Sequence, residues 1–151
     1  MPRTTRRLVF VSVLILAVSL AGAVLAYSFG WHTQLGSDNT NITIGELAAR
    51  GSVTSIPLAP LIALAVFAFL ARSRRWWGTL AVVGLCLLAL VFFAASVAEV
   101  EAPFVPSYPR AVLLTSVAVY ILLALMLLAT GVLELIDRAR TRRSASARLE
   151  R

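Results

Sequence analysis

The side chains of this sequence that could hold a metal ion lie in two polar segments. His32 and Asp38 lie in the first segment, and Glu99 and Glu101 lie in the second. An imidazole and three carboxylates are together suitable ligands for a divalent cation. Carboxylates in such positions more commonly mark the end of a helix, so we expect neither a metal site nor a bound cofactor.

The other side chains that could take part in chemistry are one thiol and two pairs of opposite charges. Cys86 is the single cysteine, so no intramolecular disulfide can form, and its apolar neighbours predict a small inert side chain. Glu134 and Arg138 are four residues apart in the order that favours an ion pair along a helix, worth a few tenths of a kcal/mol. Asp137 and Arg140 are spaced for a second pair, and together these charges predict an anchor at a helix end.

The common motifs of hydrolytic and nucleotide-binding sites are absent from the sequence. It contains no Gly-x-Ser-x-Gly, no glycine-rich phosphate loop and no His-Glu-x-x-His. The long apolar tracts, residues 8–28, 56–71, 78–98 and 111–133, contain no charged residue that would mark an ion path or a proton relay, and neither paired aspartates nor paired cysteines occur within them. We therefore expect no catalytic residues and no enzyme activity of the chain alone.

These residues are set in a chain dominated by apolar side chains. Of its 151 residues, 60% are hydrophobic and 14% are charged, and the mean hydropathy is +0.88. A soluble domain has about 45–50% apolar and about 25% charged residues. The chain is therefore predicted to be an integral membrane protein, and each tract must be helical because unpaired backbone groups are too costly in lipid.

The lengths of the tracts predict one membrane domain, an all-α bundle of four transmembrane helices. The expected spans cover residues 8–28, 56–71, 76–98 and 111–136. The second tract, of 16 residues, is short for a hydrocarbon core of about 30 Å. We expect it either to gain a turn from Val53–Ser55 or to lie in locally thinned bilayer.

The arginines predict the orientation of the bundle. Twelve of the 14 basic residues lie in the amino-terminal flank, in the link 72–75 and in the tail 137–151, whereas two lie in the outer loops 29–55 and 99–110. The positive-inside rule then places both termini in the cytoplasm. All basic residues are arginine, which suggests GC-rich coding, so we expect a bacterial plasma membrane. The net charge of +7 is explained by topology, and no nucleic acid is expected as a partner.

The amino terminus also resembles a secretory signal peptide. Basic residues precede an apolar run, and small residues follow at Ala21–Ala23 and Val24–Ala26. The run of 21 apolar residues is longer than the usual 7–15 of a signal peptide. We therefore expect the first span to be retained.

The first outer loop contains the signals of a short helix. Thr43 and Glu46 form a capping-box pattern, and Gly51 can end the helix. We expect an interfacial helix over Ile44–Arg50, with Ile44, Leu47 and Ala48 on its apolar face.

Small and hydroxyl side chains at helical spacing let membrane helices approach closely. The residues expected at helix contacts are Ser12, Ser19, Gly22, Ala23, Ala26, Cys86, Ala89, Ser96, Ser116, Tyr120 and Gly131. Tryptophan and arginine hold helix ends at the membrane surface. The expected interface anchors are Trp31, Trp76, Trp77, Arg72, Arg74 and Arg75.

These features favour two functions from different classes. The first is a non-catalytic accessory or interaction subunit, whose partners are the lipid bilayer and either another membrane protein or a second copy of the chain. The alternative is a small carrier or binder of lipid or hydrophobic solute, which needs a cavity rather than charged residues. A surface sensor built on Trp31–Arg50 is less favoured, because the tail is too short for a signalling domain.

Overall fold

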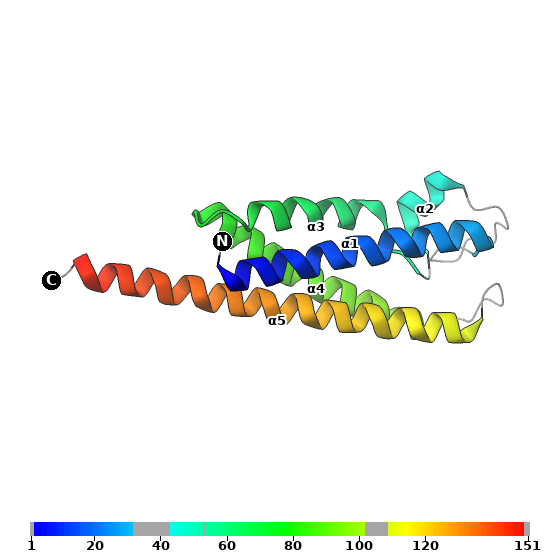
Figure 1. Ribbon diagram of the computed structural model, residues 1–151. Helices are drawn as coiled ribbons and strands as arrows, with labels where there is room; N and C mark the ends of the chain where they lie inside the picture. Colours follow the sequence, from blue (N-terminus) through cyan, green and yellow to red (C-terminus); the bar gives the residue numbers. More distant parts are fainter. Residues whose placement is uncertain (1, 32–42, 53, 102–108, 150–151) are drawn as a thin grey trace.

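The computed structural model describes residues 2–31, 43–52, 54–101 and 109–149, and every regular element in these ranges is an α-helix (Figure 1). Three of the helices are long and apolar enough to cross a membrane, which is the architecture of a helical membrane protein. The all-helical fold expected from the sequence is confirmed for these residues. The elements are α1 (Arg3–Phe29), α2 (Ile44–Arg50), α3 (Leu58–Leu70), α4 (Trp76–Glu101) and α5 (Arg110–Leu149).

The four longer helices pack as a ring in which neighbouring helices run antiparallel. α1 contacts α3 and α5, and α4 contacts the same two helices, with the most extensive packing between α4 and α5. The link between α3 and α4 is short, so these two helices form a tight hairpin. The amino end of α1, this link and the carboxyl end of α5 all lie at the left in Figure 1. We call this the arginine end of the molecule.

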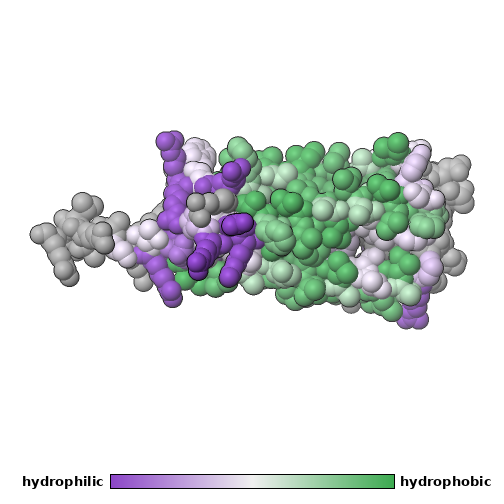
Figure 2. Space-filling view, viewed as in Figure 1, coloured by the Kyte–Doolittle hydropathy of each residue, from purple (hydrophilic) through white to green (hydrophobic). Residues whose placement is uncertain are grey.

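Apolar side chains fill the ring and also cover it. Leu8, Leu64 and Leu85 are fully buried among the helices, whereas Leu20 and Phe69 on the outside are 68% and 69% exposed. Figure 2 shows an apolar band that is continuous on this face and bounded by hydrophilic residues at the arginine end. An exterior of this kind is stable in hydrocarbon and would aggregate in water.

The structure contains a helix over Ile44–Arg50 (α2), with the bounds that the sequence predicts. The Thr43 hydroxyl accepts a hydrogen bond from the Glu46 backbone N–H at 3.2 Å, and the Thr43 N–H donates to the Glu46 carboxylate at 3.3 Å. Gly51 ends the helix with a φ of +71° and donates its N–H to the Leu47 carbonyl. The capping box and the glycine therefore act as the sequence predicts.

The second apolar tract is shorter as a helix than the sequence suggested. Pro57 has an extended conformation and α3 begins at Leu58, so the expected extra turn from residues 53–55 is wrong. Ser52 and Ser55 instead close a tight turn through two backbone hydrogen bonds of 3.0 and 3.1 Å. With 13 residues, α3 rises only about 20 Å.

The fourth tract is longer than expected. The proposed boundary at residue 136 does not end the helix, because α5 continues to Leu149 for a total of 40 residues. The segment after Gly131 contains no proline or glycine and is rich in arginine and alanine, which favour helix. At 1.5 Å per residue, α5 is about 60 Å long and extends beyond the ring (Figure 1).

The close packing of α5 on α4 at Gly131 gives a testable prediction. A Cβ atom at Gly131 would lie 2.6 Å from the Cys86 sulfur. We expect Gly131→Leu to lower the free energy of unfolding by about 1–3 kcal/mol through overpacking. Thermal unfolding in detergent measures the change, and Ala129→Leu is the matched control because Ala129 is exposed on the same helix. Adding Cys86→Ala should recover part of the loss, and an equal loss in the control would contradict this packing.

Candidate functional site

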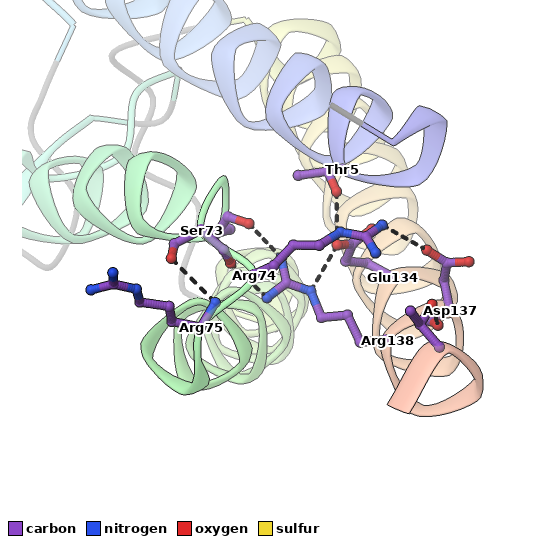
Figure 3. Close-up of polar contacts among 9 residues, drawn as sticks. Thr5, Ser73, Arg74, Arg75, Glu134, Asp137 and Arg138 are labelled. Carbon is purple, nitrogen blue, oxygen red and sulfur yellow. Dashed lines mark hydrogen bonds and ion pairs between the residues drawn. The ribbon is translucent and has the colours of Figure 1, made fainter. Parts of the chain in front are cut away.

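The first cluster of buried polar side chains lies at the arginine end and consists of Thr5, Glu134 and Arg138, which we call the Glu134 cluster. These side chains come from α1 and α5 and are 1%, 0% and 6% exposed. The Glu134 Oε1 atom accepts hydrogen bonds from Arg138 Nε at 2.7 Å and from Thr5 Oγ1 at 2.8 Å (Figure 3). The carboxylate thus joins the amino end of α1 to α5.

Arg138 connects this carboxylate to the link between α3 and α4. Its Nη1 atom donates to the Ser73 carbonyl at 3.0 Å, and its Nη2 atom donates to the Ala71 carbonyl (Figure 3). Both carbonyls follow the last residue of α3, where no further helical turn supplies donors. One guanidinium therefore satisfies two carbonyls that follow α3 and the charge of Glu134.

Burial makes the Glu134–Arg138 ion pair more important for stability than its spacing in the sequence suggested. The i,i+4 spacing predicted a weak anchor at a helix end, but both side chains are removed from solvent. A buried charge that loses its partner costs much more than an exposed one. Among the described residues, the Glu134 Oε2 and Thr4 Oγ1 atoms are buried without a hydrogen-bond partner. The cluster is therefore sensitive to any loss of a donor.

The second predicted ion pair has a different partner. Asp137 lies 3.6 Å from Arg74 of the link, and the two side chains are 41% and 49% exposed (Figure 3). The predicted pairing of Asp137 with Arg140 is wrong, since α5 turns Asp137 toward the link. Exposed pairs contribute little to stability, so we expect little stabilisation from this contact.

The second buried polar cluster lies toward the opposite end and consists of Ser52, Thr54 and Ser55, which we call the Thr54 turn. The Thr54 hydroxyl donates to the Gly22 carbonyl at 2.7 Å, and the Tyr120 hydroxyl donates to the Thr54 carbonyl at 2.8 Å. A Cβ atom at Gly22 would overlap the Thr54 carbonyl, so a glycine is needed there.

The depth of the Thr54 turn explains how a short α3 fits the ring. Gly22 is seven residues before the end of α1 and Tyr120 is ten residues after the start of α5, so the turn lies roughly 10–15 Å inside the helix ends. Irregular backbone at such a depth is stable only when it is buried in protein. The Ser19 hydroxyl meets this need by accepting the Ile56 N–H at 2.9 Å.

An apolar groove of about 190 Å³ lies beside this turn. Its walls come from α1, α2 and α3, and the predicted apolar face of α2 contributes to them. The lining residues are Ser19, Leu20, Ala23, Ile44, Leu47, Ala48, Ser55, Ile56, Leu58 and Leu61. The groove is large enough for part of a hydrocarbon chain and offers little polar surface.

The residues expected at helix contacts fall into two groups by burial. The buried ones are Ser12, Ser19, Gly22, Ala26, Ala89 and Gly131, and the half-buried ones are Ala23, Cys86, Ser96, Ser116 and Tyr120.

The expected interface anchors differ in their surroundings. Trp31 is half-buried, stacks on Phe29 and packs against the start of α5. Trp76 and Trp77 stack on each other with ring centroids 3.4 Å apart and are 54% and 56% exposed. Of the arginines in the link, Arg72 and Arg75 are exposed and Arg74 pairs with Asp137.

The carboxylates and the histidine considered for a metal site are only partly within the described residues. His32 and Asp38 lie outside them, as does the side chain of Glu101. Within the described ranges, no group of three His, Cys, Asp or Glu side chains is arranged to hold a metal ion.

No family model, no curated protein and no solved structure matches the chain. The two polar clusters are thus interpreted from their geometry. Thr5 and Thr54, which sequence reasoning did not single out, are central to them. Their signal in the sequence is a hydroxyl residue two or three positions before an apolar tract, which is too common to identify a contact.

The Glu134 cluster yields a second prediction. Arg138→Met should lower the free energy of unfolding by about 3–5 kcal/mol, because it leaves a buried carboxylate without its charge partner. The double variant Glu134→Gln/Arg138→Met should lose less than the sum of the two single losses. Chemical denaturation in detergent measures these differences, with exposed Arg140→Met as the matched control. Additive losses would show that the two side chains do not interact.

Proposed function

We propose that the protein is a non-catalytic accessory or interaction subunit of a membrane assembly, built on four membrane spans with both termini in the cytoplasm. The observation that carries the proposal is the course of α5, which leaves the ring as a continuous helix after being held by Arg138. A rigid helix that projects from a membrane bundle is a suitable contact for a partner. The sequence that follows Arg140 is rich in arginine, and this positive charge favours an acidic partner surface.

The role of α3 as the fourth span is supported by its place in the ring. It is apolar along all 13 residues and packs between α1 and α4. Because α3 is short, it does not reach the full length of the bundle. The Thr54 turn fills the remaining space between α1 and α5.

Retention of α1 is supported by its contacts. Thr5 donates to Glu134, and Ser19 and Gly22 satisfy the backbone and side chain of the Thr54 turn. A chain that lacked α1 would lose donors and acceptors at both clusters. A bacterial plasma membrane remains the location that we propose.

Thiol labelling tests the four-span arrangement. In a Cys86→Ala background, Ala49→Cys should react with a membrane-impermeant maleimide on intact cells. Arg75→Cys and Ser144→Cys should react only after permeabilisation, because four spans place them on the cytoplasmic side. All three positions are exposed in the structure. Labelling of Arg75→Cys on intact cells would show that α3 does not cross the membrane.

Gentle solubilisation followed by mass analysis of the intact particle tests the accessory role. The full chain should be recovered with another membrane protein in fixed stoichiometry. Ser144→Pro should reduce that recovery several-fold, because proline breaks a helix interior at a cost of about 3 kcal/mol, whereas Ser144→Ala should not. Recovery of the chain without a protein partner, or equal recovery with Ser144→Pro, would contradict the proposal.

The apolar groove favours a second function, a small carrier or binder of lipid or hydrophobic solute. Its walls are apolar and its two hydroxyl residues already take part in hydrogen bonds of the Thr54 turn. In the same experiment, a retained lipid or solute that is lost in Ala23→Phe but kept in Ala17→Phe would favour this function. Ala23 lines the groove, whereas Ala17 is exposed on the same helix.

A further inference from the structure

The arginine end carries a dense group of exposed positive charges where the apolar band stops (Figure 2). We call these residues the arginine collar. They come from the first turns of α1, from the link between α3 and α4, and from the projecting part of α5. The collar consists of Arg3, Arg6, Arg7, Arg72, Arg74, Arg75 and Arg140, all of which are exposed.

The carboxylates at this end leave most of the collar uncompensated. Glu134 is fully buried and paired with Arg138, so its charge is not available to the surface. Asp137 pairs with Arg74 across 3.6 Å. Among the described residues at the arginine end, seven exposed arginines therefore face one partly exposed carboxylate, Asp137. A concentration of like charge of this kind attracts an anionic partner.

The surroundings of the collar place it at the edge of a bilayer. Trp76 and Trp77 follow Arg75 directly and present a stacked, half-exposed pair of indole rings. The Arg72 guanidinium lies 5.9 Å from the centroid of the Phe69 ring, and Phe69 belongs to the exposed apolar band. Tryptophan is enriched at the level of lipid head groups, so these contacts set the guanidinium groups at that level.

We propose that the arginine collar, centred on Arg72, Arg74, Arg75 and the Trp76–Trp77 pair, is a selective binding surface for phospholipids with anionic head groups. A guanidinium donates two parallel hydrogen bonds to one phosphate, which an ammonium group cannot do. The indole pair supplies an apolar surface for the glycerol and upper acyl region of the same lipid. The collar thus matches both parts of an anionic phospholipid.

A lipid explains the collar better than a soluble polyanion does. A nucleic acid or acidic protein would leave the half-exposed Trp76 and Trp77 rings and the exposed Phe69 ring without a partner. This inference goes beyond the accessory function and does not depend on it, since lipid selectivity can be measured on the purified chain without any protein partner.

The test compares two lipids on the purified full chain in dodecyl maltoside micelles. Phosphatidylglycerol and phosphatidylcholine with identical acyl chains are added, and thermal unfolding and native mass spectra are recorded. Phosphatidylglycerol should raise the melting temperature at least about threefold more than phosphatidylcholine and should remain bound in the mass spectrum. Raising the salt to 1 M should remove the difference, because the Debye length falls to about 3 Å. Equal effects of the two lipids would overturn the proposal.

Arginine variants show which residues cause the lipid selectivity. Arg72→Gln/Arg74→Gln/Arg75→Gln should lose most of the selectivity, whereas Arg50→Gln/Arg110→Gln should keep it, since those two residues lie in the other polar segments of the chain. Arg72→Lys/Arg74→Lys/Arg75→Lys keeps the charge and should keep part of the selectivity. This lysine variant decides the outcome if the glutamine variant unfolds without added lipid. Full selectivity in the glutamine variant would overturn the proposal. So would an equal shift produced by inorganic phosphate or by a short oligonucleotide, which would indicate a soluble polyanion.

Discussion

Inside an apolar band, every backbone N–H and C=O group needs a hydrogen-bond partner from the protein itself. The helices meet this requirement along most of the chain, and the critical points are the two places where a helix stops within the bundle. One is the start of the link after α3, where the Ala71 and Ser73 carbonyls accept from Arg138. The other is the Thr54 turn before α3, which is satisfied by Ser19, Gly22 and Tyr120.

The Glu134 cluster and the Thr54 turn therefore lie at the two ends of the same helix, α3. α3 is the shortest member of the ring, and its two ends are completed by side chains and backbone from α1 and α5. The completion at the arginine end needs a buried cation, which in turn needs the Glu134 carboxylate and the Thr5 hydroxyl. Polar groups that resemble the parts of an active site are in this way explained by the geometry of one short helix.

The sequence was sufficient for the helical class of the fold, for α2 with its capping box, and for the approximate position of each long apolar helix. It was not sufficient for the Glu134 cluster, because an i,i+4 pair has the same spacing whether it is exposed or buried. It could not show the Thr54 turn either, since the contacts with Gly22 and Tyr120 join residues 32 and 66 positions apart. The start of α3 was placed at residue 56 rather than at Leu58. Pro57 and Pro60 near this end of the tract fit both a first helical turn and a preceding extended segment.

The length of α5 has a mechanical consequence. The helix is fixed to its neighbours at Arg138, and it continues for eleven residues beyond that point, to Leu149. Because this projecting part of α5 is a continuous helix, a small change in its angle at Arg138 moves its carboxyl end sideways. A tilt of about 10° at Arg138 would move Leu149 by roughly 3 Å at a rise of 1.5 Å per residue. The Glu134 carboxylate, which pairs with Arg138, thus lies at the point about which the projecting part of α5 would tilt.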